Sequence, residues 1–266
     1  MTDVPIKRRN HGRGHSYIDT DTGEKIRSVT TMLNGVPKAA LVKWAAETTA
    51  NYAVDHWDEL SAMLPTERLK VLYGARTRQL NAASSKGTKI HALASKLVAG
   101  EVVDMPPELK PYVLAYVDFL NDFDVRPILV EAVIVSHEHR YCGTLDLVAG
   151  LLNADASDYE TWLIDVKSGS GVYGETALQE AGYGFADAWV DADGTERPLP
   201  PIDRYGVVHL RPDQTYELLP LTVGERQHRQ LLYAAEMVTF GEEARDLVGE
   251  PIPVPRAGGY RLEADE

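Results

Sequence analysis

The sequence predicts an α/β protein with a mainly helical N-terminal part and a C-terminal part of strands and helices. Residues 28–125 carry apolar residues at the three- and four-residue spacing of helices that face a core. Residues 126–240 contain short Val-, Ile- and Leu-rich runs bounded by polar turns, with two further helical patterns. We expect 1–266 to form one large domain, with an irregular segment at 1–27 and a loose tail at 241–266.

Composition excludes several classes of protein. Hydrophobic residues make up 44% and charged residues 25%, which is ordinary for a globular protein in water. No apolar run approaches the roughly 20 residues that span a bilayer, and the basic N-terminus lacks the apolar segment of a signal peptide. Cys142 is the single cysteine, so sites that need several thiolates are excluded. We therefore expect a cytoplasmic protein without a membrane partner.

Charge is unevenly distributed along the chain. The net charge of −13 argues against a nucleic-acid partner. The segment 68–96, however, has no acidic residue and carries seven basic ones: Arg68, Lys70, Arg76, Arg78, Lys86, Lys89 and Lys96. Such a segment is either a solvated face or a local binding surface for a polyanion, and the sequence leaves both open.

The helical elements are expected mainly before residue 125. Residues 17–29 suggest a short hairpin around a turn at 21–23, and the hydroxyl-rich Ser28-Val29-Thr30-Thr31 suggests a helix start. Trp44 is interpreted as a core anchor. Helices are expected over 41–56, 66–80, 84–100, 108–122, 175–190 and 224–240.

Strands are expected over 127–136, 144–152, 161–167, 205–210 and 216–221. The first of these runs is interrupted by Glu131, which alone could be a charge at a strand edge. Cys142 is interpreted as a small packing residue.

Charged residues interrupt two of the apolar strands. Because side chains alternate, Leu163, Asp165 and Lys167 share one face of their strand, and we assign the face of Trp162, Ile164 and Val166 to the core. Asp146 lies within the preceding strand. A buried charge costs several kcal/mol unless a partner or metal compensates it. The pattern predicts a cation site with a fixed positive neighbour, and the alternative is a buried Asp165–Lys167 ion pair.

Three helical side chains are further candidates. His91 lies at the margin of an apolar stripe, where it is either a structural histidine or a ligand. Gln179 and Tyr183, four residues apart, share a helix face, which is either surface or part of a site.

In chain order, these features resemble the PD-(D/E)XK nuclease superfamily, in its RecB-like branch, which includes phage and CRISPR-associated exonucleases. The resemblance covers about residues 28–235, and its specificity lies in the order of five motifs that are individually weak. Ser28–Thr31 followed by Trp44 also looks like the N-terminal lead of phage members. The motifs are Gly87-Thr88-Lys89-Ile90-His91, Glu131, Gly143-Thr144-Leu145-Asp146, Asp165-Val166-Lys167, and Gln179 with Tyr183.

The resemblance implies a restriction-endonuclease-like core, a mixed central sheet flanked by helices. It implies Mg²⁺ or Mn²⁺ as cofactor, and oxygen ligands with one imidazole suit these ions. The implied ligands are His91, Asp146, Asp165 and the Val166 carbonyl. Lys167 would orient the attacking water, Glu131 would support the metal site, and Gln179 and Tyr183 would orient the site and touch DNA.

The resemblance also implies a function: a metal-dependent DNA nuclease, expected to be an exonuclease acting at DNA ends in recombination, repair or phage DNA metabolism. The expected partner is DNA, at its ends or as a single strand. The helical N-terminal part would form a wall of the DNA channel, with Arg76, Arg78, Lys86 and Lys89 on the DNA backbone. Alternatives are a catalytically idle DNA-end-binding or scaffolding subunit, an endonuclease of the same fold, and a metal hydrolase with another substrate. The chain departs from iron–sulfur members, which have four cysteines, so we expect no cluster. It also lacks a helicase Walker A motif, so a separate recombinase or annealing protein is a candidate partner.

Overall fold

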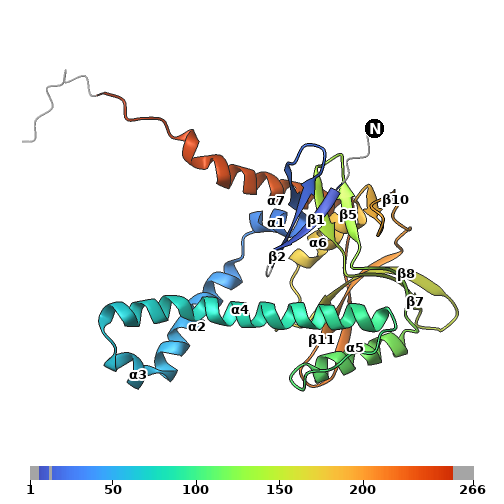
Figure 1. The fold of residues 1–266 in the computed structure, drawn as a ribbon, viewed down its shortest axis with the longest axis horizontal. Coiled ribbons are helices and arrows are strands. Elements are labelled where there is room, and N and C mark those ends of the chain that lie inside the picture. The colour runs from blue at the N-terminus through green and yellow to red at the C-terminus, as the bar shows by residue number, and fades with distance from the viewer. Residues whose placement is uncertain (1–5, 12–13, 254–266) are drawn as a thin grey trace, which may run out of the picture.

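The computed structural model describes residues 6–11 and 14–253, which form two β-sheets with helices packed around them (Figure 1). The prediction of an α/β protein is confirmed, because both sheets are mixed and helices cover them. Three helices form a hairpin that extends away from the sheets in Figure 1: α2 (Ala39–Asp55), α3 (Trp57–Ala62) and the N-terminal half of α4 (Pro65–Val98).

The five-stranded sheet holds the central strands of the fold. Its order is β4-β7-β8-β11-β12. Strand β8 pairs antiparallel with β7 and parallel with β11, so it lies in the middle of a mixed sheet. The strands are β4 (Arg126–Val130), β7 (Leu147–Leu152), β8 (Tyr159–Lys167), β11 (Arg204–Leu210) and β12 (Tyr216–Pro220).

The seven-stranded sheet has the order β1-β2-β3-β6-β5-β9-β10. Only β3 and β6 are parallel neighbours in it. The strands are β1 (Ile6–His11), β2 (Gly14–Asp19), β3 (Lys25–Ser28), β5 (Val133–Ser136), β6 (Tyr141–Thr144), β9 (Ala188–Val190) and β10 (Glu196–Arg197).

Most of the remaining helices pack against the five-stranded sheet. The predicted helix start at Ser28 is confirmed, because its side chain accepts a hydrogen bond from the Thr31 N–H and caps α1. Helix α5 begins next to Pro111, which suits a first turn. The elements are α1 (Val29–Met32), η1 (Leu33–Gly35), α5 (Lys110–Asp122), α6 (Glu175–Gly184), α7 (Glu225–Glu243) and η2 (Ala244–Leu247).

Two apolar clusters lie on opposite faces of the five-stranded sheet. On one face, α4 and α5 pack through residues such as Ile90 and Phe119 against Ile164 and Val166 of β8. On the other face, α1, α6 and α7 pack against Leu163 and its neighbours. The sequence assigned only the first of these faces of β8 to the core. Both are buried, so Asp165, on the Leu163 face, lies inside the protein.

The predicted strands 127–136 and 144–152 are each divided. The first becomes β4 and β5, with a bend at Glu131 and Ala132, and the second is separated from β6 by Leu145 and Asp146. Each half joins a different sheet, so the single central sheet expected from the sequence is two. A run of strand residues that passes from one sheet to the other must bend, because a straight strand can pair within only one sheet.

The predicted helices 66–80 and 84–100 are one continuous helix, α4. The intervening Asn81-Ala82-Ala83 contains no proline or glycine, and alanine has the highest helix propensity. Ser84, predicted to start the second helix, instead accepts a hydrogen bond at its backbone oxygen from Thr88 Oγ1, at 3.0 Å.

Four other predictions need correction. The helix 175–190 ends at Gly184, and Trp189 lies in β9. Trp44 is only half-buried, and no residue of α2 is buried, so it is not a core anchor. The N-terminal segment contains three strands rather than one hairpin. Helix α7 and η2 extend past residue 240, and the rest of the predicted tail beyond 253 lies outside the described residues.

Among the helices that the structure describes, none combines the length and apolar character that crossing a bilayer requires.

Candidate metal centre

The bends that divide the two strands place two carboxylates side by side. Glu131 N–H donates to the Asp146 carbonyl at 2.9 Å, and Leu145 N–H donates to the Ala132 carbonyl at 3.0 Å. Glu131 has a φ of 49°, in the left-handed region that is sparsely populated by residues other than glycine. Such backbone strain is typical of functional positions, where it directs a side chain. Here it accompanies the break between the two sheets.

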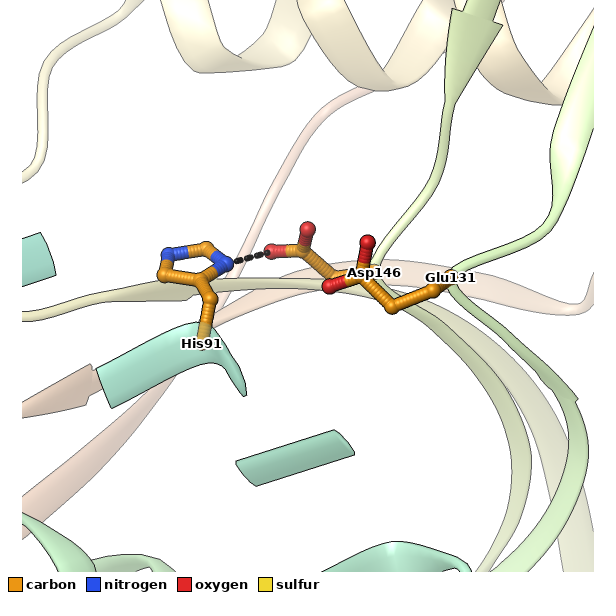
Figure 2. Close-up of side chains that lie close together, drawn as sticks. All are labelled: His91, Glu131 and Asp146. Atoms are coloured by element: carbon orange, nitrogen blue, oxygen red, sulfur yellow. Dashed lines mark ion pairs between the residues drawn. The ribbon is translucent and has the colours of Figure 1, made fainter. Parts of the chain in front are cut away.

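Helix α4 brings His91 to these carboxylates. His91 Nδ1 lies 3.2 Å from Asp146 Oδ2, and Figure 2 shows the imidazole facing the two acids. Ser95, one turn further along α4, donates to Glu131 Oε1 at 3.1 Å. One possible ligand atom from each of His91, Glu131 and Asp146 lies within 4.8 Å of the others. The three side chains therefore converge on one point from a helix and two bends.

Asp165 and Lys167 lie beside this group on β8. Lys167 Nζ is 3.0 Å from Asp165 Oδ1 and 2.9 Å from Oδ2. Gln179 Nε2, from α6, donates to Asp165 Oδ1 at 2.8 Å and lies 3.2 Å from the Tyr183 hydroxyl. Val166 N–H donates to Asp146 Oδ2 at 2.8 Å, which connects β8 to the metal-binding candidates. Gln179 and Tyr183 are therefore part of the site rather than free surface.

The sequence expected Asp165 among the ligands, with the Val166 carbonyl. The structure groups Glu131 with His91 and Asp146 instead, and pairs Asp165 with Lys167. Val166 contributes its N–H to Asp146. Asp165 Oδ2, although near Lys167, accepts no hydrogen bond among the described residues and is fully buried, so one carboxylate oxygen is left for a further partner.

The pKa values of His91, Glu131 and Asp146 are shifted by neighbours within this group. Burial would lower the pKa of His91, but the Asp146 carboxylate outweighs it and raises the pKa to about 9. Burial would likewise raise the pKa of Asp146, and the facing His91 keeps it below its ordinary value. Burial and Asp146 raise the pKa of Glu131. At neutral pH, His91 therefore carries a proton where a cation would compete with it.

Burial and the neighbouring charges also perturb the β8 pair. Burial raises the pKa of Asp165 to about 6, against the lowering effect of Lys167. For Lys167, burial would lower the pKa, and Asp165 outweighs it and raises the pKa. The lysine is therefore charged and held by its aspartate.

Glu180 is a site residue that the sequence analysis missed. It lies on α6 between Gln179 and Ala181, its exposed fraction is 0%, and neither carboxylate oxygen has a hydrogen-bond partner among the described residues. Burial, Asp165 and Asp146 raise its pKa well above the ordinary value. The sequence shows only that Glu180 follows Gln179 on a helix with an apolar face. That position is equally consistent with an exposed glutamate.

The glycine of the Gly143-Thr144-Leu145-Asp146 motif has a packing reason. A Cβ at Gly143 would lie 2.5 Å from Cε1 of Tyr183, which is closer than carbon atoms approach. Because Gly143 has no side chain, the Tyr183 ring can lie against it and reach Gln179. The position of Gln179 and Tyr183 on α6 therefore depends on the glycine of this motif.

The residues present fit a divalent cation. Carboxylate oxygens with one imidazole are the donor set that Mn²⁺ and Mg²⁺ accept. Three acids, Glu131, Asp146 and Asp165, meet His91 and Lys167 in one cavity of about 940 Å³. The three acids outnumber the two basic side chains, so a cation here lowers the electrostatic free energy of the folded chain.

The site lies where two cavities meet. The first, of 940 Å³, has a polar wall that includes Arg8, Ser84, Thr88 and Lys96. The second, of 970 Å³, runs between α2, α4 and the glycine-rich loop 168–174. Both are lined by Gly87, His91 and Lys167. We call the first the polar arm and the second the apolar arm of one groove.

The predicted DNA-binding residues are not all on this groove. Lys86 lines the apolar arm, with its ammonium hydrogen-bonded to the Tyr112 hydroxyl and 3.8 Å from the ring centroid. Arg76, Arg78 and Lys89 line neither arm. Arg78 donates to the Val71 carbonyl at 3.1 Å. Arg8 lines the polar arm, and the sequence analysis did not include it among the DNA-binding candidates because strand β1 was not expected.

No known protein-family model matches this chain, and no curated protein matches its sequence.

Proposed function

We propose that the protein is a divalent-metal-dependent DNA nuclease with a restriction-endonuclease-like core of the PD-(D/E)XK type. One observation carries the proposal: His91, Glu131 and Asp146 converge within 4.8 Å beside the Asp165–Lys167 pair. That arrangement unites a candidate cation site with a fixed ammonium, as hydrolysis of a phosphodiester requires.

His91, Glu131 and Asp146 would hold the cation, and Asp165 Oδ2, which accepts no hydrogen bond among the described residues, is a further candidate ligand. A Mg²⁺ or Mn²⁺ ion held by these residues would supply Lewis-acid polarisation of the scissile phosphate and a lowered pKa for a bound water. Lys167 binds the attacking water or a phosphate oxygen through the ammonium that Asp165 holds in place. Gln179 fixes Asp165 Oδ1, and Tyr183 supports Gln179.

The rival is an idle DNA-end-binding subunit with the same fold. It would be expected to lack one of the acids or the lysine, and all of them are present and mutually connected. The connected set therefore favours catalysis.

Cleavage assays with linear and circular DNA test the proposal. With Mn²⁺ or Mg²⁺, we expect degradation of linear DNA and survival of closed circles, because exonucleases need an end, and no cleavage in EDTA. Nicking of circles would make the protein an endonuclease. End binding without cleavage under any of these conditions would favour the idle subunit and overturn the nuclease proposal.

Gly87 offers a second prediction, because it lies inside helix α4 and faces both arms of the groove. A Cβ at Gly87 meets no atom within 4 Å, so Gly87→Ala should raise the free energy of unfolding by about 0.5–1 kcal/mol. The added methyl group enters the substrate path, and we expect cleavage to slow by roughly tenfold or more.

Gly241→Ala in α7 is the matched control, since a Cβ there also meets no atom within 4 Å. It should raise stability and leave cleavage unchanged. Thermal unfolding and initial cleavage rates measure both effects. Unchanged cleavage in Gly87→Ala would move the substrate path away from the junction of the two arms.

A further inference from the structure

We propose that the apolar arm holds the unstacked bases of a single DNA strand on its way to the metal centre, with Trp44 as the stacking platform. This inference rests on the proposed nuclease function, and it adds the form of the substrate: a single strand with accessible bases, rather than an intact duplex.

Aromatic and apolar side chains line the arm on several sides. Leu41 and Trp44 come from α2, Leu80 comes from α4, Tyr112 comes from α5, and Tyr173 comes from the glycine-rich loop. Trp44 is half-buried, so part of its indole is available, and Tyr173 is 54% exposed. Every base has a flat aromatic face that can stack on an aromatic side chain. Such stacking therefore binds single strands without base specificity.

The two arms differ in chemistry, which gives the strand a path. The polar arm offers cations and hydroxyl groups, which bind phosphate oxygens: Arg8, Lys96, Ser84, Thr88 and Ser95. The apolar arm also has cations and hydroxyl groups, at Lys38, Lys86, Ser168 and Ser170, but its lining is more apolar than that of the polar arm. Because both arms meet at His91 and Lys167, a strand with its bases in the apolar arm delivers its backbone to the candidate metal centre.

A duplex fits the apolar arm poorly. An intact double helix presents phosphates and sugars outward and keeps its bases stacked inside, so it cannot offer a base to Trp44. The apolar wall would then desolvate phosphates without compensation. The lining therefore selects a strand whose bases are already separated.

Glycine-rich loop 168–174 leaves the arm wide. Gly169 and Gly171 line the arm, where a Cβ at Gly169 would meet no atom within 4 Å and one at Gly171 would meet only the Tyr173 ring at 3.9 Å. The loop follows Lys167 directly, so the wall of the arm and the candidate catalytic lysine belong to one segment. Tyr173 is the large side chain that this loop adds to the wall.

The same helical hairpin supplies a matched control. Trp57, on α3, is 60% exposed and does not line the groove. Comparing Trp44→Ala with Trp57→Ala therefore separates a stacking platform from the loss of any exposed tryptophan.

Binding should be measured on the full chain with Ca²⁺, using fluorescently labelled oligothymidylate, an abasic oligonucleotide of equal length and a duplex. The abasic strand keeps the phosphates and lacks bases. We expect oligothymidylate to bind more tightly than the other two. Trp44→Ala should weaken it by about 5- to 150-fold, the range of one lost base–aromatic stack, and change abasic binding little. Trp57→Ala should change neither.

Two further variants keep the test independent of folding. Trp44→Phe retains a ring and should keep most of the affinity. Tyr173→Ser removes a half-exposed loop side chain and should weaken oligothymidylate selectively. Equal binding of abasic and thymidylate strands, or equal losses on both in Trp44→Ala, would overturn the inference. If the base-binding test fails but the protein cleaves DNA with Mn²⁺, the nuclease proposal stands without this inference. If the protein binds bases selectively but never cleaves, the nuclease proposal is overturned and base binding stands.

Discussion

Lys167→Met is expected to reduce cleavage by at least about 10²–10³-fold while leaving Mn²⁺ affinity nearly intact. The ammonium lies 2.9 Å from Asp165, and neither residue belongs to the converging group of His91, Glu131 and Asp146. Removing the lysine therefore removes charge stabilisation from the reaction without removing that group. Asp146→Asn should instead lose both cleavage and Mn²⁺ binding. Single-turnover cleavage and calorimetric titration with Mn²⁺ at about pH 8 measure the two effects.

Lys43→Met serves as the control, because the Lys43 side chain is 78% exposed and pairs only with Glu47 among the ion pairs described. It should behave like the unmodified protein. Undiminished Mn²⁺ binding in Asp146→Asn would place the cation elsewhere. Normal cleavage by Lys167→Met would remove the lysine from the chemistry and leave Asp165–Lys167 as a structural ion pair.

Glu180→Met should stabilise the fold by about 1–3 kcal/mol, because it replaces a buried carboxyl group that has no hydrogen-bond partner among the described residues. The change also has a pH signature. The folded chain keeps the proton on Glu180 above the ordinary pKa of 4.5, and the unfolded chain releases it. The free energy of unfolding of the unmodified protein therefore falls as the pH rises from 4.5 toward the raised pKa of the folded state.

Urea unfolding between about pH 5 and 8, in the absence of divalent cations, measures this dependence, which Glu180→Met should flatten. Glu236→Met on the exposed side of α7 is the control and should leave the slope unchanged. Lower stability in Glu180→Met at every pH would show that the carboxyl group has a stabilising partner, and its role would need to be sought in the site.

Much of the five-stranded sheet could be predicted from sequence because its strands are short apolar runs bounded by polar turns. The alternation along β8 also placed Asp165 and Lys167 on one face. The candidate site followed from residue types in order: His91 on a helix margin, and acids within apolar strands. These patterns are local in the sequence, and a local pattern predicts the structure correctly where tertiary burial agrees with it.

The division of the strands into two sheets could not be predicted, because it depends on pairings between distant segments. Glu131 gives no indication in the sequence that it adopts a positive φ. The end of α6 at Gly184 is similar: β9 pairs with β5, far earlier in the chain, and this pairing replaces the helical continuation. Trp44 was misassigned because an apolar stripe on a helix indicates a core and a groove equally well.

The pairing of β3 with β6 bears on when the protein becomes functional during its synthesis. Arg27, which is paired with Tyr141 in that ladder, donates to the Ala235 carbonyl at 3.1 Å and to Thr239 Oγ1 at 2.8 Å, so β3 is hydrogen-bonded to α7. Contacts across such separations form late, because a long loop must close before they contribute. A ribosome-bound chain therefore exposes Glu131, Asp146 and Asp165 before α7 is made. The groove is lined by residues that precede α7, but α6, which holds Asp165 through Gln179, packs against α7. We therefore expect the proposed nuclease activity to appear only after α7 has been made.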